Sequence, residues 1–288
     1  MKRTPPFSPA SEVCGTVVEI GEDVDGFAVG DKVFGAAISG GLAELTRVPS
    51  HTCYKLPDGV DPTLAAGFEL NYGTSWHGIV DVAKLQEGET MLVLGASGGV
   101  GMAAIDIGRA LGANVVACAS TTAKLQACVE QGANRTINYS DADGTSFKQK
   151  LKAAGIYGGI DVVFDPVGGG VSEPAMRALG WGGRFLVIGF AAGGENPKEA
   201  IPNLPINLAL LNERQIQGVF WGAWKMRDGN VQNKKNVLEM LRLIQEKKMS
   251  PTVSKIFPLS QCVEAFRMIM ERKAIGKIVV QVNGNSPL

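Results

Sequence analysis

From about residue 90 onward, short apolar runs alternate with amphipathic stretches along the chain. The apolar runs are rich in Val, Ile, Leu and Phe and predict strands at 90–94, 114–119, 135–137, 160–164, 183–188 and 215–220. The stretches between them have apolar residues at helical spacing and predict helices at 101–111, 124–131, 147–154, 174–179 and 208–211. Strands that are apolar nearly throughout and are separated by helices form a parallel sheet covered on both faces. The pattern therefore predicts an α/β fold with a doubly wound parallel sheet.

The two ends of the chain have a different pattern. The first 70 residues predict a small β domain, with short strands at 14–21, 29–35 and 41–48. Residues 64–82 are typical of a helix that is interrupted at 71–73. After the sheet come helices at 237–247 and 261–272, a strand between them and a last strand at 278–282. No low-complexity linker separates these parts, so we expect the tail to return to the β domain. The predicted boundaries are 1–75 with 252–288 for the β domain and 76–251 for the sheet domain.

Composition and charge narrow the possible functions. The chain has 288 residues, 45% of them hydrophobic, and its net charge is zero. Such a chain has no bulk attraction for nucleic acid or an acidic membrane surface, and it contains no nucleic-acid motif. No run of 18 apolar residues predicts a membrane span. Residues 1–10 lack the apolar stretch of a signal peptide. We expect a cytoplasmic location, or a mitochondrial one if a leader precedes Met1.

Cysteines and histidines do not indicate a metal site. The five cysteines are odd in number and form no C-x-x-C pair, which argues against a disulfide framework and a four-cysteine zinc site. The two histidines, His51 and His77, are not spaced as paired ligands, whereas a catalytic zinc usually has three protein ligands. We therefore expect no metal and interpret both histidines as surface or packing residues.

One glycine-rich segment indicates a nucleotide site. Residues 95–101, Gly-Ala-Ser-Gly-Gly-Val-Gly, lie between a predicted buried strand and a predicted helix, as the dinucleotide fingerprint of Rossmann domains requires. Gly98 would let the backbone approach a pyrophosphate, and Gly101 would let the helix pack closely on the strand. The first glycine of the fingerprint is replaced here by Ala96. The alternative interpretation is an ordinary glycine-rich turn.

The end of the next strand indicates which nicotinamide cofactor is bound. An NAD enzyme usually has Asp or Glu there, to bind the ribose 2′-hydroxyl. Residues 118–124, Cys-Ala-Ser-Thr-Thr-Ala-Lys, contain no acid. Ser120 and Thr121 can donate to a 2′-phosphate and Lys124 can pair with it, so the segment favours NADPH. The alternative for Lys124 is a solvated lysine, although a cation is unfavourable in the first turn of a helix.

Several motifs together resemble the medium-chain dehydrogenase/reductase superfamily, and within it the zinc-independent quinone oxidoreductase branch. The resemblance covers nearly the whole chain, and its most specific stretches are residues 9–15, 29–33, 96–101, 165–169 and 276–277. It implies a GroES-like catalytic domain, a Rossmann domain and NADPH as cofactor. It also implies a homodimer joined at the sheet edge formed by residues 216–220.

The resemblance also implies positions for the site residues. Lys124 and Tyr139 match the pair that holds the adenosine 2′-phosphate, and Thr74 matches a position beside the nicotinamide. Residues 165–169 should lie against the cofactor, and residues 189–191 should flank the nicotinamide ring. The full set expected to bind the cofactor is Asn71, Thr74, Ser97, Gly98, Gly99, Val100, Ser120, Thr121, Lys124, Tyr139, Val167, Gly168, Gly189, Phe190, Ala191, Phe220, Trp221 and Lys277.

Three further side chains have two interpretations each. Tyr72 is the candidate catalytic residue, as a hydroxyl in the pocket, or it is a packing tyrosine under the cofactor. Trp221 either walls the pocket or lies in the dimer interface. Glu12 is interpreted as a buried structural carboxylate rather than a catalyst.

Two features depart from the family pattern. Ala10 stands where the family has a glycine after the proline. The chain also starts part-way into the family's catalytic domain, without its opening strands and the loop with a substrate-side tyrosine and asparagine. We therefore expect a GroES-like domain that is incomplete at its N-terminus and exposes apolar strand edges.

These observations leave three functional hypotheses. The first is a zinc-free NADPH-dependent reductase that transfers hydride to a quinone or an α,β-unsaturated carbonyl compound. The second is an enoyl-thioester reductase of the same superfamily, with a different pocket shape. The third is an NADPH-binding protein with little turnover, because its substrate domain is shortened. In the first two, the protein positions hydride donor and acceptor and stabilises the developing oxyanion.

Overall fold

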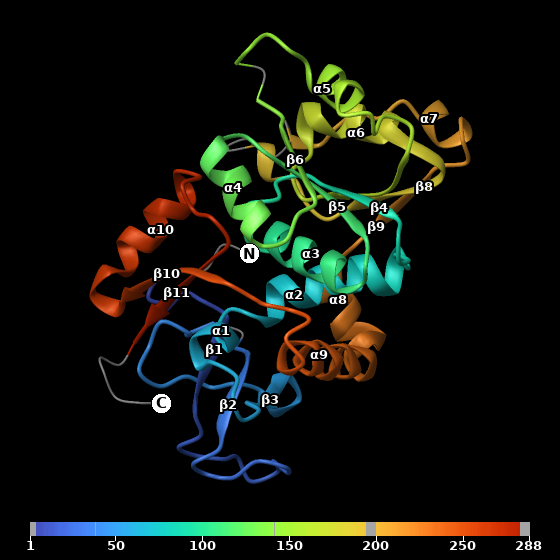
Figure 1. Cartoon of the computed structure of the whole chain (residues 1–288). Helices are drawn as coiled ribbons and strands as arrows, with labels where there is room; N and C mark the ends of the chain where they lie inside the picture. The colour runs from blue at the N-terminus through green and yellow to red at the C-terminus, as the bar shows by residue number, and fades with distance from the viewer. Residues whose placement is uncertain (1–3, 38, 141, 194–199, 283–288) are drawn as a thin grey trace. The chain divides into compact units, whose positions relative to one another are not determined.

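The computed structural model describes residues 4–37, 39–140, 142–193 and 200–282 (Figure 1). The chain divides into two compact units. The first unit comprises residues 1–71 and 251–288, and the second comprises residues 72–250. Among the described helices, none is long and apolar enough to cross a membrane.

The first unit contains two small sheets. Strands β1 (Glu12–Thr16), β2 (Lys32–Ala36) and β3 (Cys53–Lys55) form an antiparallel sheet in that order. Its core is aromatic, because Phe34 stacks on Tyr54 at 5.3 Å between ring centroids and meets the edge of Phe68 at 6.3 Å. Strands β10 (Val253–Pro258) and β11 (Lys277–Gln281) pair in parallel. Parallel strands need a long crossover, and here α10 (Cys262–Met270) supplies it. The short helices of this unit are η1 (Ser50–Thr52), α1 (Pro62–Ala65) and η7 (Leu259–Gln261).

The strand predicted at residues 41–48 is wrong, because the structure has bends and irregular backbone there and places the third strand at β3. The backbone of this segment pairs elsewhere: Gly41 donates to the carbonyl of Ala10 at 3.0 Å and Leu42 to that of Pro9 at 3.1 Å. A segment whose amides bond a neighbouring loop cannot extend a ladder beside β2. Leu45, which gave this segment part of its strand-like pattern, is 72% exposed.

Ala10 has a positive φ of 64°, a conformation that favours glycine. This explains physically why a glycine suits the position. We expect Ala10→Gly to raise the free energy of unfolding by about 0.5–1 kcal/mol, since relief of backbone strain exceeds the added entropy of the unfolded chain. Urea denaturation followed by circular dichroism measures this, with Ala28→Gly in the same unit as control. A lower stability for Ala10→Gly than for the parent chain would contradict the argument.

The helix predicted at 64–82 is interrupted at a different place from the one expected. Turns at residues 66–68 separate α1 from α2 (Glu69–Trp76), and α2 then runs without a break through Gly73 into the π-helical turn η2 (His77–Val82). Gly73 is needed for close packing, because a Cβ there would lie 2.8 Å from the indole ring of Trp221. The glycine thus marks a helix contact, and not the helix break that we predicted.

The second unit confirms the predicted doubly wound parallel sheet. Its strand order is β6-β5-β4-β7-β8-β9, with all neighbours parallel. The order reverses between β4 and β7, and ligands bind at such a switch point, beyond the carboxyl ends of the strands. The strands are β4 (Thr90–Val93), β5 (Asn114–Ala119), β6 (Arg135–Asn138), β7 (Ile160–Asp165), β8 (Leu179–Val187) and β9 (Gln215–Gly218). The helices are α3 (Gly99–Ala110), α4 (Thr122–Glu130), α5 (Phe147–Ala153), η3 (Gly169–Val171), α6 (Ser172–Ala178), η4 (Ala191–Gly193), α7 (Asn207–Leu210), α8 (Trp221–Trp224), η6 (Lys225–Gly229) and α9 (Asn230–Gln245).

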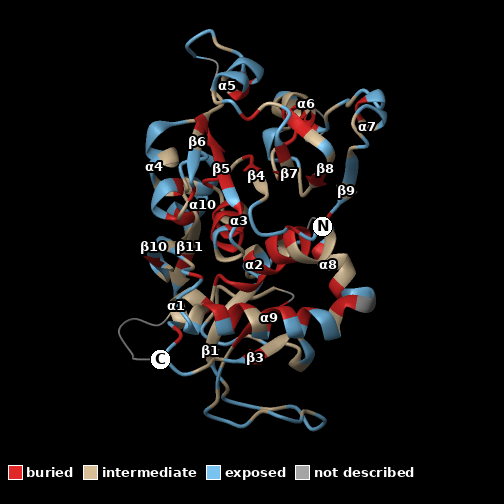
Figure 2. Cartoon of the chain, turned by 45° about the vertical axis from the view of Figure 1, so that its right-hand side comes forward, coloured by how far each residue is buried: buried red, intermediate tan, exposed pale blue. Residues whose placement is uncertain are grey.

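Helices cover both faces of this sheet. On one face, Phe147 and Leu151 of α5 and Met176 of α6 pack with alternate strand residues in one buried cluster. On the other face α3 approaches so closely that a Cβ on Gly108 would lie 2.6 Å from Met91. Figure 2 shows buried positions concentrated along the central strands and the inner sides of these helices. Burial on both faces explains why the strands are apolar nearly throughout.

Among the predicted boundaries of the second unit that are wrong are the end of β9 and the start of α9. Strand β9 ends at Gly218, so Phe220, predicted as strand, instead precedes α8 as its N-cap residue. The helix predicted at 237–247 begins earlier, at Asn230. A hydrophobic pattern does not detect the first turns of this helix, because residues buried there are polar. Asn233 accepts a hydrogen bond from Trp221, and Asn236 donates one to Asp81.

Candidate dinucleotide site

The turn from β4 into α3 is built for close approach to the backbone. Gly98 is the N-cap residue of α3 and gives its first amides no side-chain acceptor. The Gly98 amide donates to the carbonyl of Gly95 at 2.9 Å, which closes the turn. A Cβ on Gly101 would lie 2.6 Å from the carbonyl oxygens of Gly95 and Ala96, so only glycine lets the helix start this close to the strand. These amides and the positive end of the helix dipole suit a phosphate group.

The predicted residues of this turn lie together. Ser97 is buried, and Gly99 and Val100 are half-buried at the start of α3. The hydroxyl of Ser75 donates to the carbonyl of Val100 at 2.9 Å. This bond ties the turn to α2, so the neighbouring Thr74, which is half-buried, is carried on a helix anchored to the glycine turn.

The residues predicted to bind the 2′-phosphate come from two adjacent strand ends. Ala119 at the end of β5 is paired with Asn138 at the end of β6, and the Tyr139 amide donates to the carbonyl of Ala119 at 3.1 Å. Ser120 therefore follows β5 at the level where Tyr139 follows β6. Tyr139 is held on the core, with its ring edge-on to Phe147 at 6.2 Å.

Thr121 has a structural role that the sequence analysis did not assign to it. It is the N-cap residue of α4, and its hydroxyl oxygen accepts a hydrogen bond from the Lys124 amide at 3.3 Å. The cap starts α4 directly after Ser120 and places the half-buried Lys124 in the first helical turn. The hydroxyl proton of Thr121 is still available for donation to an anion, so the cap and the predicted contact are compatible.

The loop after β7 is shaped by the carboxylate of Asp165. It accepts hydrogen bonds from the amides of Val167 at 2.8 Å and Gly168 at 2.9 Å, and from the Ser172 hydroxyl at 2.6 Å. Burial raises the pKa of this carboxyl above its ordinary value, and the three hydrogen bonds partly oppose the rise. Gly168 has a φ of 71°, and a Cβ there would lie 2.3 Å from the carbonyl oxygen of Ala200. Asp165 therefore holds its own loop and is not turned toward a ligand.

The segment after β8 lies along this loop. The Gly189 amide donates to the carbonyl of Asp165 at 3.3 Å, and the Ala191 amide donates to that of Pro166 at 3.1 Å. The side chain of Phe190 is 42% exposed. Three of the predicted contact segments, 95–101, 165–168 and 189–191, are thus brought to the same edge of the sheet. The close approaches at Gly101 and Gly168 are contacts with the chain's own backbone, and they allow tight packing of these segments at that edge.

Tyr72, the predicted catalytic residue, is buried, and its hydroxyl donates to the carboxylate of Asp106 at 2.9 Å. Burial, together with this carboxylate, raises the pKa of the Tyr72 hydroxyl well above its ordinary value. Asp106 is fully buried and also accepts from Arg109 at 2.8 Å and from the Ser250 amide at 2.9 Å. The geometry favours the second interpretation of Tyr72, a packing tyrosine.

Four further residues predicted to bind the cofactor lie outside these segments. Trp221 is buried against Gly73, and its indole N–H donates to Asn233 at 2.8 Å. Phe220 is 77% exposed. Asn71 and Lys277 belong to the first unit.

In the first unit, the Lys277 ammonium is ion-paired with the carboxylate of Glu12, which also accepts from the Leu70 amide at 2.7 Å. The stem of Lys277 lies over Gly67, where a Cβ would be 2.6 Å away. Glu12 thus has the contacts of a structural carboxylate.

His77 has the contacts of a packing residue. Its imidazole stacks on Trp224 at 3.9 Å between centroids, and its Nδ1 lies 2.9 Å from the carboxylate of Asp81. Within the described ranges, no three His, Cys, Asp or Glu side chains gather into a group that could hold a metal ion.

The structural roles of the Asp106 and Asp165 carboxylates were not predicted from the sequence. Each had a signal in the sequence. Asp106 is an acid within an apolar helix, Ala103 to Ile107, and Asp165 ends an apolar strand directly before a Pro-Val-Gly turn. A lone acid in an apolar run indicates a buried hydrogen-bonded carboxylate, because an unpaired one would be too costly to bury.

The doubly wound sheet, its glycine turn and the small β unit define a two-domain α/β protein of the Rossmann class. Family models agree with both parts: residues 99–243 match the zinc-binding dehydrogenase model, and residues 1–58 match the alcohol dehydrogenase GroES-like domain. The chain is 34% identical over 278 residues to the quinone oxidoreductase-like protein 2 homolog of Nematostella vectensis, covering 96% of this chain and 73% of the relative.

Two solved structures have the same fold. One is a probable oxidoreductase from Mycobacterium abscessus, with a TM-score of 0.84 and 28% identity, covering 98% of this chain and 82% of that one. The other is the quinone oxidoreductase of Thermus thermophilus, which was also solved in complex with NADPH. Its TM-score is 0.77 and its identity 28%, covering 98% of this chain and 83% of that one.

This chain therefore belongs to the quinone oxidoreductase branch of the medium-chain dehydrogenase/reductase superfamily, as its motifs predicted. The predicted fold class, a Rossmann domain with a GroES-like domain, is confirmed.

Proposed function

We propose that this protein is an NADPH-dependent oxidoreductase that transfers hydride to a quinone or to the β-carbon of an α,β-unsaturated carbonyl compound. The observation that carries the proposal is the arrangement at the ends of β4, β5 and β6. There the glycine turn, the segment from Ser120 to Lys124, and Tyr139 follow three neighbouring strands. The family relationship and the NADPH complex of the Thermus thermophilus enzyme support it.

NADPH is preferred over NADH in this proposal because of the end of β5. Residues 118–124 contain no carboxylate that would bind a ribose 2′-hydroxyl and repel a 2′-phosphate. Lys124 offers an ammonium for that phosphate, and Tyr139, one strand away, offers an aromatic ring and a hydroxyl.

NADPH, when bound, supplies a hydride from C4 of its nicotinamide ring. The chain's own residues do the positioning. The first amides of α3 would hold the pyrophosphate, and Thr74 and residues 189–191 would flank the ring, so that donor and acceptor would be kept within reach. Tyr72 is not given a proton-transfer role in this scheme, because its hydroxyl donates to Asp106. The proton that follows the hydride comes from water or from another hydroxyl.

We also propose that the reaction needs no zinc. One of the two histidines, His77, is engaged by Asp81 and Trp224, which leaves His51 as the remaining imidazole. A catalytic zinc typically has three protein ligands from clustered His, Cys, Asp or Glu. Full activity after chelation and dialysis, with elemental analysis of the protein, is the expected result.

The predicted homodimer is proposed to form at the free edge of the six-stranded sheet. β9 is the last strand in the order, so one side of its backbone has no neighbouring strand among the described residues. Ile216 on this strand is 47% exposed, and Phe220 just beyond it is 77% exposed. An apolar edge strand is a template for pairing with a second copy. Sedimentation equilibrium distinguishes one copy from two.

Lys124→Ala is the direct test of the cofactor assignment. We expect it to raise the Kd for NADPH about tenfold or more, because a charge-assisted contact to phosphate is lost. The Kd for NADH, which has no 2′-phosphate, should change by less than about twofold. Titration calorimetry with each cofactor measures both. Lys235→Ala, an exposed lysine on α9, is the matched control. An unchanged Kd for NADPH in Lys124→Ala would overturn the assignment.

The acceptor is tested separately, by following NADPH oxidation with a panel of quinones, enones and enoyl thioesters. Turnover of quinones or enones supports the proposal. Turnover of enoyl thioesters alone would instead support the enoyl-thioester reductase. Tight binding of NADPH without oxidation by any acceptor would support the cofactor-binding protein with little turnover.

A further inference from the structure

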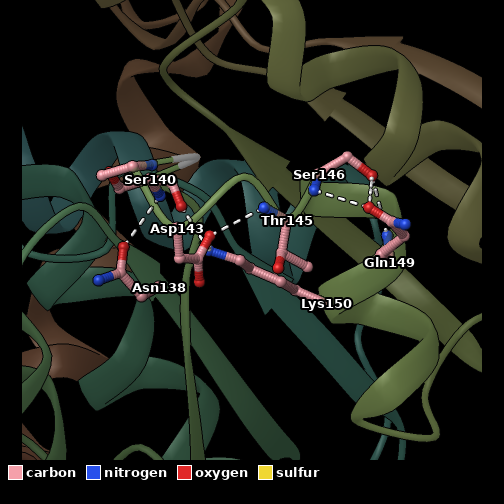
Figure 3. A network of polar contacts seen from close by, with 8 residues as sticks. Asn138, Ser140, Asp143, Thr145, Ser146, Gln149 and Lys150 are labelled. Atoms are coloured by element: carbon pink, nitrogen blue, oxygen red, sulfur yellow. Dashed lines mark hydrogen bonds and ion pairs between the residues drawn. The ribbon is translucent and has the colours of Figure 1, made fainter.

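A polar network folds the segment that follows β6, and Lys150 lies at its centre (Figure 3). The Lys150 ammonium donates to the carbonyl of Ser140 and forms an ion pair with Asp143 at 3.0 Å. The Asn138 side chain accepts from the Ser140 amide at 2.9 Å, so both the N–H and the C=O of Ser140 are held. The backbone directly after Tyr139 is thus fixed on both sides of residue 140.

Helix α5 presents Lys150 to this segment in a defined way. Ser146 and Gln149 form a capping box, with the Ser146 amide 2.9 Å from the Gln149 side chain, which fixes the start of the helix. One helical turn later, the Lys150 side chain is 14% exposed, whereas its partner Asp143 is 61% exposed. The Lys150 side chain is therefore largely covered, whereas the Asp143 side chain is mostly exposed to solvent.

The network lies next to the strand ends that carry the proposed 2′-phosphate residues. Asn138, its first member, is paired with Ala119, and Ser120 follows Ala119 on β5. Tyr139 stands between Asn138 and Ser140, the two residues that the network ties down. Any shift of Ser140 would therefore move Tyr139 relative to the segment from Ser120 to Lys124.

The network also balances charge. Asp143 is an acid in the segment that follows Tyr139, and an uncompensated carboxylate near a 2′-phosphate repels it. Lys150 neutralises that carboxylate, and its hydrogen bond is the largest cause of the lowered pKa of Asp143. NADH has no 2′-phosphate, so the Asp143 carboxylate would not weaken the binding of NADH.

We propose that Lys150 is a specificity-determining positioning residue. It holds Tyr139 in place through Ser140 and cancels the charge of Asp143, and in this way favours NADPH over NADH without touching the cofactor. The inference rests on the proposed function, in which Lys124 and Tyr139 receive the 2′-phosphate.

The test compares Kd values for NADPH and NADH in Lys150→Met, which keeps most of the length of the side chain and removes its charge. We expect the Kd for NADPH to rise about fivefold, the upper range for one exposed charge pair, and that for NADH to change less than about twofold. Lys152→Met is the matched control, since it makes the same charge change on α5 while its ammonium lies over the Tyr157 ring at 5.3 Å. Thermal melting followed by circular dichroism verifies that each variant is folded.

Two companion variants separate charge from position. Asp143→Asn should leave NADPH binding no weaker than in the parent chain, because it removes the repelling carboxylate. Lys150→Met combined with Asp143→Asn should regain the part of the NADPH preference that is due to charge. Failure of the double variant to regain any preference would refute the charge part of the proposal.

The outcomes also separate this inference from the proposed function. If Lys150→Met and Lys152→Met have equal Kd values for NADPH, while Lys124→Ala still loses the NADPH preference, the role of Lys150 is overturned. The proposed function then stands. Equal weakening of NADPH and NADH binding in Lys150→Met would show that Lys150 has only a structural role. A parent chain that binds both cofactors equally, and is unaffected by Lys124→Ala, would remove the proposed function and this inference with it.

Discussion

Gly101→Ala is expected to raise the Kd for NADPH about 100-fold or more and to lower the free energy of unfolding by about 2–3 kcal/mol. The added Cβ would lie 2.6 Å from the carbonyl oxygens of Gly95 and Ala96 and 2.7 Å from the carbonyl carbon of Ala96. These are backbone atoms and cannot rotate away, so α3 must lift from β4. The first amides of the helix then move away from the position that the proposed pyrophosphate needs. Titration calorimetry and urea denaturation measure the two effects.

The control for this prediction is Gly170→Ala. A Cβ at Gly170 would meet no atom within 4 Å, so this variant makes the same chemical change without a clash. It should bind NADPH like the parent chain and differ in stability by less than about 0.5 kcal/mol. Parent-like binding and stability of Gly101→Ala would show that the close contact between α3 and β4 does not limit the site.

Asp106→Ala is expected to lower the free energy of unfolding by about 3–5 kcal/mol, the range for breaking a buried charged network. The carboxylate is fully buried and accepts hydrogen bonds from the Tyr72 hydroxyl, Arg109 and the Ser250 amide. The variant leaves these donors without their acceptor in a dry environment. The shift of the urea midpoint measures the loss. Glu130→Ala, an exposed acid on α4, should cost little, and an equal effect of the two substitutions would refute the argument.

Tyr72→Phe removes one of these donors and tests the predicted catalytic role at the same time. We expect a loss of about 1–2 kcal/mol in stability, because one hydrogen bond to a buried carboxylate disappears while the ring stays. The kcat for NADPH oxidation should remain within about twofold. A fall in kcat of about 100-fold with unchanged stability would instead identify the hydroxyl as a proton donor.

Local patterns in the sequence were sufficient to predict the sheet and its glycine turn. Runs such as Met91 to Leu94 are apolar at every position, and in the structure all four residues are fully buried. The glycines at 98 and 101 lie at the expected junction of strand and helix. Both features depend on residues adjacent in sequence, whose patterns reflect burial on two faces and tight turns. The strand predicted at 41–48 was wrong because its backbone bonds residues 9 and 10, a pairing that no local pattern records.

In the candidate site too, some features follow from the local sequence and others only from the tertiary structure. The absence of an acid in residues 118–124 and the presence of Lys124 are facts of the sequence, and the proposed preference for NADPH follows from them by charge. The sequence alone did not show which side chains already have hydrogen-bond or packing partners within the protein. Tyr72 has the same appearance in the sequence whether it faces a pocket or donates to Asp106, 34 positions away. From the sequence, Gly73 resembles a helix breaker, whereas in the structure the ring of Trp221 packs against it.

For this protein, the order of apolar and polar residues determined the class of fold, the position of the glycine turn and the charge around the proposed 2′-phosphate site. Tertiary structure decided the strand order, the pairing of Ala119 with Asn138 that brings Ser120 and Tyr139 to neighbouring strand ends, and the network in which Lys150 holds Ser140 and Asp143. The physical reason is the distance along the chain over which each interaction acts. Turn geometry and burial act between neighbouring residues, whereas hydrogen bonds and packing contacts select partners that are distant in the chain.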